Sequence, residues 1–202
     1  MVAYIIIPGI DGSDEQHWQT LWERELGPGA VRIAPASWSE PELADWVGSV
    51  QAAYEAAHRT ADESAYESAD ETARGQGEPG GVVLVAHSLG CWAAAAWLAD
   101  APAGRVRGAL LVAPPDPEGP AFPRRAAATF LGLRARPLSC PALVVGSPDD
   151  PYCTPETTAH LAEQWQARLH VTDAGGHLNS ASGLGTWPQG RGLLHSLTAD
   201  CH

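Results

Sequence analysis

The chain contains no lysine, and all twelve of its basic side chains are arginines. Mechanisms that form a Schiff base on a lysine are therefore excluded. Basic residues are also few, because 24 acidic side chains oppose these arginines and leave a formal net charge of -12. A protein that binds nucleic acid needs a basic surface for the phosphates, so we expect no nucleic-acid partner.

Long hydrophobic runs are missing as well. The longest apolar stretches, residues 81–86 and 93–98 among them, fall well short of the roughly 20 residues that span a bilayer. The apolar run before Pro8 lacks the basic start and the length of a secretory signal. We therefore expect no membrane association and a cytoplasmic location.

Cysteine is scarce, with four residues that form no Cys-x-x-Cys pair and no spacing typical of zinc ligands. We expect reduced thiols, with Cys91 and Cys140 acting as small buried hydrophobic side chains. Neither a metal site nor a cofactor is predicted from this sequence.

Apolar stretches of strand length alternate with amphipathic stretches of helical period along most of the chain. Strands are expected at residues 2–7, 31–34, 81–86, 106–113, 141–146 and 169–172, and helices at 17–26, 41–56, 88–99 and 155–165. Continuously apolar strands are covered on both faces, as in a parallel sheet. This pattern predicts an α/β protein: a three-layer α/β/α sandwich with a mostly parallel sheet of about six strands.

One segment departs from this alternation. Residues 61–73 contain acidic near-repeats, and a stretch rich in glycine and proline follows as far as Gly81. Such a segment has few large apolar groups to offset the entropy lost on ordering. We interpret residues 1–202 as a single domain with an acidic insertion at about 57–80. A solvated helix extension with a flexible loop is expected there, and a docking tail for a basic partner is the alternative.

Ser88 lies between the strongest predicted strand and a helix, in the pentapeptide Ala86-His87-Ser88-Leu89-Gly90. A serine at the apex of a strand–turn–helix is typical of a nucleophile elbow, which lifts the hydroxyl above the sheet. The next backbone N–H, that of Leu89, would then face a developing oxyanion. The alternative is that Ser88 only caps a helix, and His87 beside it is expected to be structural.

A serine nucleophile needs a histidine base and a carboxylate that orients it. Asp149 and Asp150 follow the predicted strand 141–146, and His177 follows the last predicted strand in a glycine-rich loop. Ligands in open α/β sheets gather at the carboxyl ends of the strands, so these groups are expected to converge at one edge. The residues alone leave open which aspartate is the acid.

Several short motifs, in this order, resemble the α/β-hydrolase superfamily, and more narrowly the small serine hydrolases grouped with retinoblastoma-binding protein nine and its bacterial relatives. The matching segments are residues 8–9, 13, 17–19, 87–90, 149–152, 176–179 and 182–188. The resemblance covers nearly the whole chain except about residues 57–80. Residues 114–137 are too few, and too rich in proline and arginine, for a large cap.

The resemblance implies a minimal α/β-hydrolase fold and a catalytic triad of Ser88, His177 and the aspartate directly before the proline, Asp150. It also implies an oxyanion hole in which a backbone N–H near Ile10 or Asp11 joins that of Leu89. No cofactor and no metal take part in this chemistry.

The resulting prediction is a serine hydrolase that cleaves a small carboxylic ester or amide through an acyl-enzyme. A non-catalytic protein-binding module on a hydrolase scaffold and an acyltransferase with the same triad are the alternatives. His17, Asn179 and Trp187 are candidate substrate-binding residues. The alternatives are that His17 holds the first loop in place and that Trp187 fills the core beside Pro188. We expect a small-molecule substrate and a monomer or small homo-oligomer.

Overall fold

The computed structural model describes residues 2–67, 81–101 and 106–199. Its sheet has six strands in the order β2-β1-β3-β4-β5-β6, and every neighbouring pair is parallel. The strands are β1 (Ala3–Ile7), β2 (Ala30–Arg32), β3 (Val82–His87), β4 (Val106–Val112), β5 (Ala142–Gly146) and β6 (Arg168–Val171). The α-helices of the described part are α1 (Trp18–Leu26), α2 (Leu43–Glu67), α3 (Leu89–Leu98), α4 (Pro155–Trp165) and α5 (Pro188–Ala199).

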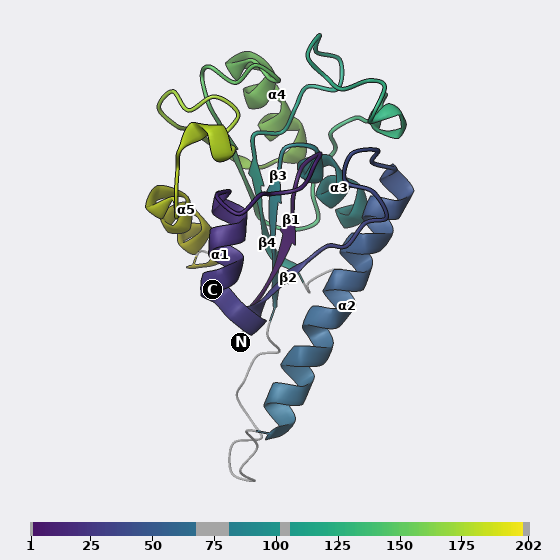
Figure 1. Ribbon diagram of the computed structural model, residues 1–202, viewed down its shortest axis with the longest axis vertical. Coiled ribbons are helices and arrows are strands. Elements are labelled where there is room, and N and C mark those ends of the chain that lie inside the picture. Colours follow the sequence, from purple (N-terminus) through teal and green to yellow (C-terminus); the bar gives the residue numbers. More distant parts are fainter. Residues whose placement is uncertain (1, 68–80, 102–105, 200–202) are drawn as a thin grey trace.

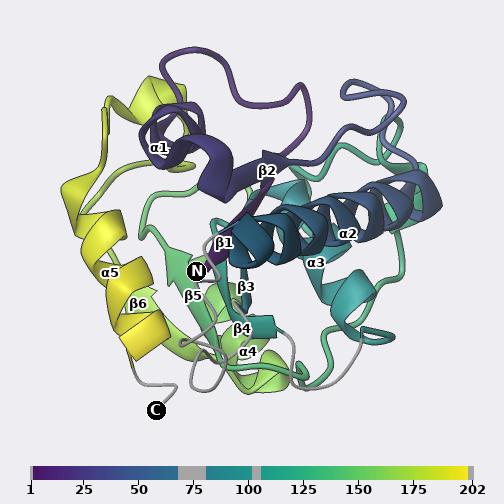
Figure 2. The ribbon, with the colours of Figure 1, turned by 90° about the horizontal axis from the view of Figure 1, so that it is seen from below.

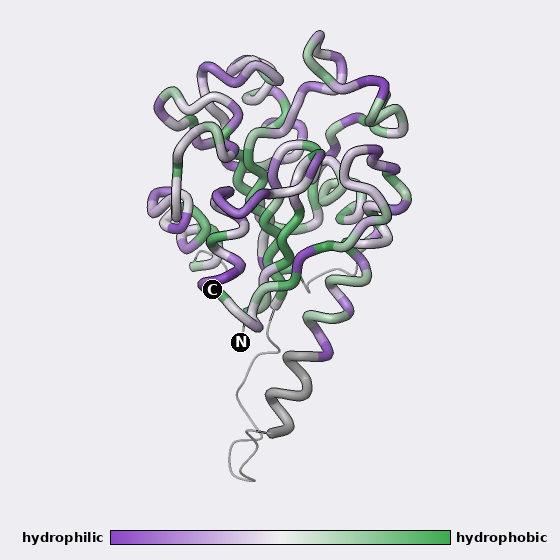
Figure 3. The backbone as a smooth tube through the Cα atoms, viewed as in Figure 1, coloured by the Kyte–Doolittle hydropathy of each residue, from purple (hydrophilic) through white to green (hydrophobic). Residues whose placement is uncertain are grey.

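The helices cover both faces of the sheet, as Figures 1 and 2 show. Successive strand residues point to opposite faces, so the strands contribute to two separate cores. Ile6 and Val83 pack in the core that α1 and α5 cover, whereas Ile5 and Leu84 pack in the core under α2, α3 and α4. All six residues of β3 are buried, and Figure 3 shows the hydrophobic residues concentrated in the sheet. The prediction of a three-layer sandwich with a parallel sheet is confirmed, and the part of the chain that the structure describes contains no large cap.

The predicted elements are present with shifted ends, and one helix was missed. Helix α2 continues to Glu67, well beyond the predicted end at residue 56, and the rest of the insertion lies outside the described residues. Helix α5 was not predicted because it contains Gly190 and Gly192, and glycine disfavours helices. Gly190 is required by packing, since a Cβ there would lie 2.3 Å from the Trp187 ring.

Two further expectations are tested by burial and by helix composition. Cys91 is fully buried as predicted, but Cys140 is only partly buried, so that expectation was wrong for Cys140. Among the described residues, every helix is too short or too polar to pass through a bilayer.

The loops that follow β1, β3, β5 and β6 leave the sheet at one edge, because all strands run in the same direction. This edge lies at the top of Figure 1. It carries Ser88 after β3, Asp149 and Asp150 after β5, and His177 after β6.

Candidate active site

Ser88 occupies a sharp turn between β3 and α3, with φ 54° and ψ -128°. Residues other than glycine rarely adopt a positive φ, and the strain is a feature of functional sites. Two glycines make the turn possible. A Cβ on Gly90 would lie 2.4 Å from the carbonyl oxygens of Ile7 and Pro8, and a Cβ on Gly9 would lie 2.7 Å from that of Ser88. The end of β1 and the start of α3 therefore approach each other closely around the serine.

The side chains of Ser88, His177 and Asp150 form a continuous hydrogen-bonded row. His177 Nδ1 lies 2.9 and 3.0 Å from the two carboxylate oxygens of Asp150, and His177 Nε2 lies 2.8 Å from Ser88 Oγ. A carboxylate only accepts, so Nδ1 carries the hydrogen and Nε2 is left to accept the serine hydroxyl. Ser88 makes no side-chain capping bond to α3. The hydroxyl is therefore directed at the imidazole rather than at the helix.

The two adjacent aspartates point in different directions. Asp150 is almost fully buried, with its side chain 2% exposed, and also accepts the backbone N–H of Tyr152 at 2.9 Å. Asp149 does not contact the imidazole. Its Oδ1 accepts the Ser147 hydroxyl at 2.6 Å and the backbone N–H groups of Gly175 and Gly176 at 2.9 and 2.8 Å. Asp149 therefore ties the loop after β5 to the loop that carries His177.

The pKa of Asp149 is consistent with its role as an acceptor that anchors the histidine loop. The Ser147 hydroxyl, followed by the N–H groups of Gly176 and Gly175, lowers the pKa of the Asp149 carboxyl below its usual value. Hydrogen bonds to an ionised carboxylate favour that form. Asp149 therefore remains an acceptor for the glycine-rich loop down to a pH below its ordinary pKa.

His87 supports His177 through the backbone. Its Nε2 donates to the carbonyl oxygen of His177 at 2.9 Å, and the residue as a whole is 4% exposed. Burial, reinforced by the nearby His177 and His17, holds the pKa of His87 well below its usual value. The ring centroids of His17 and His87 are 4.8 Å apart, and those of His87 and His177 are 5.1 Å apart. A neutral His87 is thus the structural neighbour that the sequence suggested.

Two backbone N–H groups from different segments are candidates for the oxyanion hole, that of Leu89 directly after Ser88 and that of Ile10 on the loop after β1, and both residues line the cavity. Within the described residues neither makes a hydrogen bond to the protein, whereas the N–H of Asp11 donates to the Trp38 carbonyl at 2.9 Å. Of the two positions left open by the resemblance, Ile10 is therefore the one with a free donor. A pair of free N–H groups beside a serine hydroxyl has the composition of an oxyanion hole.

The loop that holds Ile10 is anchored by Gln19, a residue that sequence reasoning missed. Gln19 is fully buried, and its Nε2 donates to the carbonyl oxygens of Ile7 and Val85 at 3.2 and 3.0 Å. Its Oε1 accepts the Ser13 hydroxyl at 2.7 Å. Gln19 thus joins the ends of β1 and β3 to the first loop. Only its place in the motif His17-Trp18-Gln19 could have indicated this role.

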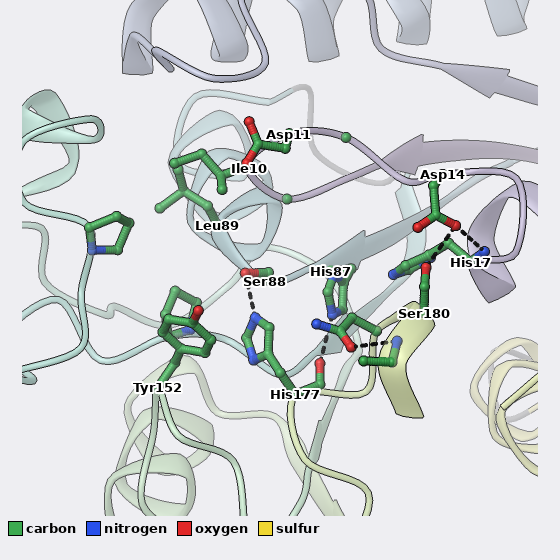
Figure 4. A pocket seen from close by; sticks show the side chains of 16 residues that line it. Ile10, Asp11, Asp14, His17, His87, Ser88, Leu89, Tyr152, His177 and Ser180 are labelled. Carbon is green, nitrogen blue, oxygen red and sulfur yellow. Dashed lines mark hydrogen bonds between the residues drawn. The ribbon is translucent and has the colours of Figure 1, made fainter. Parts of the chain in front are cut away.

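A cavity of about 420 Å³ opens above Ser88. Figure 4 shows Ile10, Leu89 and Tyr152 around the serine, with Asp14, His17 and Ser180 farther along the wall. The cavity is lined by Gly9, Ile10, Asp11, Gly12, Asp14, His17, His87, Ser88, Leu89, Pro115, Pro123, Tyr152, His177, Asn179, Ser180 and Ala181. Of the candidate substrate-binding residues, His17 and Asn179 therefore reach the cavity.

Trp187 does not line the cavity, and this placement corrects the expectation that it binds substrate. Trp187 is 4% exposed, and its ring centroid lies 5.0 Å from that of Trp18 and 5.9 Å from that of Trp22. The backbone at Trp187 has a φ of 43°, and the ring lies in the core under α1 and α5. The tryptophan thus fills the core, which was the alternative considered from the sequence.

His17 has two different ring nitrogens. Nδ1 accepts the backbone N–H of Gln19 at 3.2 Å and caps α1, while Nε2 is buried without a hydrogen-bond partner among the described residues. Burial is the main cause that lowers the pKa of His17 to about 4. The side chain therefore stays neutral near pH 7 and serves the first loop as well as the cavity wall.

Tyr152 is a second site residue that was not singled out from the sequence. Its ring centroid lies 4.4 Å from that of His177, and it lines the cavity. It follows Asp150 by two residues, so its backbone holds the acid while its ring covers the base. No group of three or more histidine, cysteine, aspartate or glutamate side chains suited to a metal ion occurs in the described part.

The chain resembles known hydrolases in its sequence profile and in its fold. The sequence profile of the family described as Serine hydrolase matches residues 4–61 and 71–196. A YdeN-like hydrolase from Pectobacterium atrosepticum is 25% identical with a TM-score of 0.74, over 100% of this chain and 92% of the other. The ydeN gene product of B. subtilis is 22% identical with a TM-score of 0.74, over 98% and 100% of the two chains.

A third solved structure, esterase 2 of Thermogutta terrifontis, is 19% identical with a TM-score of 0.62, over 98% of this chain and 83% of the other. A search of curated proteins gives no match.

Proposed function

We propose, from the premise that this chain belongs to the serine hydrolase family, that it cleaves small carboxylic esters or amides through an acyl-enzyme on Ser88. Membership of this family and the similarity to solved hydrolase structures support hydrolase activity. The hydrogen-bonded row from Asp150 through His177 to Ser88 is the observation that carries the finer proposal.

In the first half of the reaction, Ser88 Oγ attacks the acyl carbonyl carbon and its proton passes to His177 Nε2, 2.8 Å away. The carbonyl oxygen becomes an oxyanion that accepts the N–H groups of Leu89 and Ile10. Asp150 accepts the Nδ1 hydrogen throughout, which fixes the imidazole tautomer and stabilises the imidazolium. The tetrahedral intermediate then expels the alcohol or amine, which takes the proton from His177.

In the second half, His177 removes a proton from a water molecule as the water oxygen attacks the acyl carbon of the ester on Ser88. The same N–H groups stabilise the second oxyanion. The bond to Ser88 Oγ then breaks, and the serine recovers its proton from His177 as the carboxylic acid leaves.

The test is labelling of the purified protein with a fluorophosphonate probe together with hydrolysis of p-nitrophenyl acetate. The protein should react with both, and Ser88→Ala should lose both, while Ser196→Ala on α5 is the matched control. Undiminished labelling of Ser88→Ala would refute the assignment of the nucleophile. Failure of the unaltered protein to be labelled or to hydrolyse any ester would instead favour a non-catalytic binding module.

A further inference from the structure

Asn179 lines the cavity, and a hydrogen bond within its own turn fixes the orientation of its side-chain amide. Its Oδ1 accepts the backbone N–H of Ala181 at 3.0 Å, and its own backbone N–H donates to the Ser182 hydroxyl at 3.1 Å. Asn179 is the N-cap of the short 3-10 helix Ser180–Ser182 and forms a capping box with Ser182. Because the oxygen is held by this turn, Nδ2 is the end of the amide that stays free. It has no hydrogen-bond acceptor among the described residues.

Most other side-chain donors of the cavity wall already have acceptors in the protein. Ser88 donates to His177, His177 to Asp150, and His87 to the carbonyl of His177. The Ser180 hydroxyl donates to Asp14 at 2.8 Å.

Two groups remain besides Asn179. The Nε2 of His17 is fully buried, so a ligand in the cavity does not reach it in this conformation. The Tyr152 hydroxyl is the second free donor, but a hydroxyl also accepts and rotates about its C–O bond. The Asn179 amide is therefore the accessible group that only donates and is held in one direction.

The charges of the cavity wall limit what this donor can bind. Two carboxylates, those of Asp11 and Asp14, line the cavity, and no arginine of the described ranges does. The hydrogen bond from Ser180, followed by that from the Gln16 N–H, lowers the pKa of Asp14, which keeps it ionised near neutral pH. A carboxylate or phosphate on the substrate would face this negative potential without a counterion, so a neutral acceptor oxygen fits the wall better.

The polar wall is opposed by an apolar one. Ile10 and Leu89 lie on the other side of Ser88 from His17 and Ser180 in Figure 4, with Asp11 beside Ile10, and Pro115 and Pro123 add to the apolar lining. A substrate that fills the cavity would place hydrocarbon against these residues and an acceptor against Asn179. A purely hydrocarbon substrate would bury the amide unpaired, which is costly.

We propose that Asn179 Nδ2 donates a hydrogen bond to a neutral oxygen of the substrate, an ether, hydroxyl or carbonyl oxygen close to the scissile bond. Asn179 is thus a specificity-determining residue that selects oxygen-bearing esters or amides over hydrocarbon and anionic ones. This inference rests on the proposed hydrolase reaction at Ser88.

The experiment uses pairs of substrates that differ by one atom. In the acyl pair, p-nitrophenyl methoxyacetate replaces one CH₂ of p-nitrophenyl butyrate by an ether oxygen. In the alcohol pair, 2-methoxyethyl acetate does the same to butyl acetate. Each kcat/KM is divided by the rate constant of alkaline hydrolysis, which removes intrinsic reactivity. The unaltered protein should favour the ether in at least one pair by about 3- to 10-fold, as expected for one neutral hydrogen bond.

Two variants isolate the donor from the cap. Asn179→Asp keeps an oxygen for the Ala181 N–H and replaces the donor by an acceptor, and Asn179→Ser keeps a capping oxygen but removes the amide. Both should lower the ether preference to about onefold or less. Intrinsic reactivity cancels when variant and unaltered protein are compared on the same pair. Asn179→Asp should also improve p-nitrophenyl glycinate, whose ammonium group is charged, relative to the propionate.

Several results would overturn the proposal. No ether preference in either pair, or the same preference in both variants, would remove Asn179 from substrate selection. A preference of the unaltered protein for the glycinate would assign recognition to the carboxylates of Asp11 and Asp14, and a preference for a hemisuccinate would refute the charge argument. In each of these cases Ser88 is labelled and esters are cleaved. A protein that is neither labelled nor active fails the proposed function itself, and this inference falls with it.

Discussion

Gly9→Ala is the substitution that tests most directly whether the close approach around Ser88 controls the reaction. A Cβ at position 9 would lie 2.7 Å from Ser88 Cβ, 3.2 Å from Ser88 Oγ and 3.4 Å from the carbonyl oxygen of His87. Ordinary contacts of this kind begin at 3.4 Å, so Gly9 and Ser88 must separate by about 0.7 Å. The backbone at Gly9 does not have a positive φ, and the added methyl group acts through this contact alone.

This separation of Gly9 and Ser88 would displace both the nucleophile and the loop that carries the second oxyanion-hole N–H. Ser88 Oγ would move relative to His177 Nε2, now 2.8 Å away, and the loop with the Ile10 N–H would move away from Leu89. A displacement approaching 1 Å costs on the order of 10²-fold in rate. We therefore expect Gly9→Ala to lower kcat for p-nitrophenyl acetate by about 100-fold, with a loss of stability of about 1–3 kcal/mol from overpacking.

The assay compares kcat, the rate of fluorophosphonate labelling and thermal unfolding in three proteins. Gly48→Ala, in α2, is the matched control because no atom lies within 4 Å of its added Cβ. It should keep full activity and gain up to about 1 kcal/mol from the better helix propensity of alanine. A Gly9→Ala protein that is folded and retains kcat within about threefold would refute the argument that crowding at this contact sets the geometry of the nucleophile.

Two further predictions concern the aspartates and the buried histidine. Asp150→Asn should lower kcat on the order of 10³- to 10⁴-fold because it disturbs the imidazole tautomer. Asp149→Asn keeps the Oδ1 acceptor and should change kcat little. Asp149→Ala releases the histidine loop and should lower kcat by about 10- to 100-fold. Ester-hydrolysis kinetics of the three variants check this, and a larger loss in Asp149→Asn than in Asp150→Asn would reverse the two roles. Burial lowers the pKa of His17 from 6.5 to about 4. As the pH falls, the unfolded chain therefore takes up this proton before the folded protein does. The free energy of unfolding should then decrease between pH 6.5 and pH 4, by up to about 3 kcal/mol from this residue. His17→Asn keeps an N-cap acceptor for α1, and urea unfolding at several pH values should show a shallower decline; an unchanged slope would contradict the argument.

The fold could be predicted from the sequence because its signals are local. The run Val82–Val85 is apolar throughout, and Ser88 and a helix follow only two residues later, so strand, turn and nucleophile candidate are all contained in one short segment. Helix α5 was not predicted because its glycine at position 190 is explained only by the close packing of the Trp187 ring, a contact that the local sequence pattern does not reveal. The same ring was assigned to the substrate because it is near His177 in sequence, whereas its turn directs it into the core.

In the candidate site, too, residues in local motifs could be predicted, whereas roles that depend on distant contacts could not. The candidate residues Ser88 and His177 were found from motifs, but neighbouring Asp149 and Asp150 have the same chemistry and almost the same position. Only the geometry separates them, one on the imidazole and the other on the loop amides. Gln19 was missed because its role depends on the carbonyl of Val85, 66 residues away in the sequence.

A hydrolase with no large cap must hold its reacting groups by contacts between the loops themselves, and this chain does so with bonds from side chains to backbone. Gln19 joins the ends of β1 and β3, His87 joins β3 to the histidine loop, and Asp149 joins the loop after β5 to the same histidine loop. Each bond ends on a peptide group, so it fixes the path of a loop without occupying the atoms that react. The reacting atoms of Ser88 and His177 are then positioned by neighbours whose own polar groups are satisfied. Asn179 fits this arrangement on the cavity side, because its oxygen serves the turn and only its Nδ2 remains for a ligand.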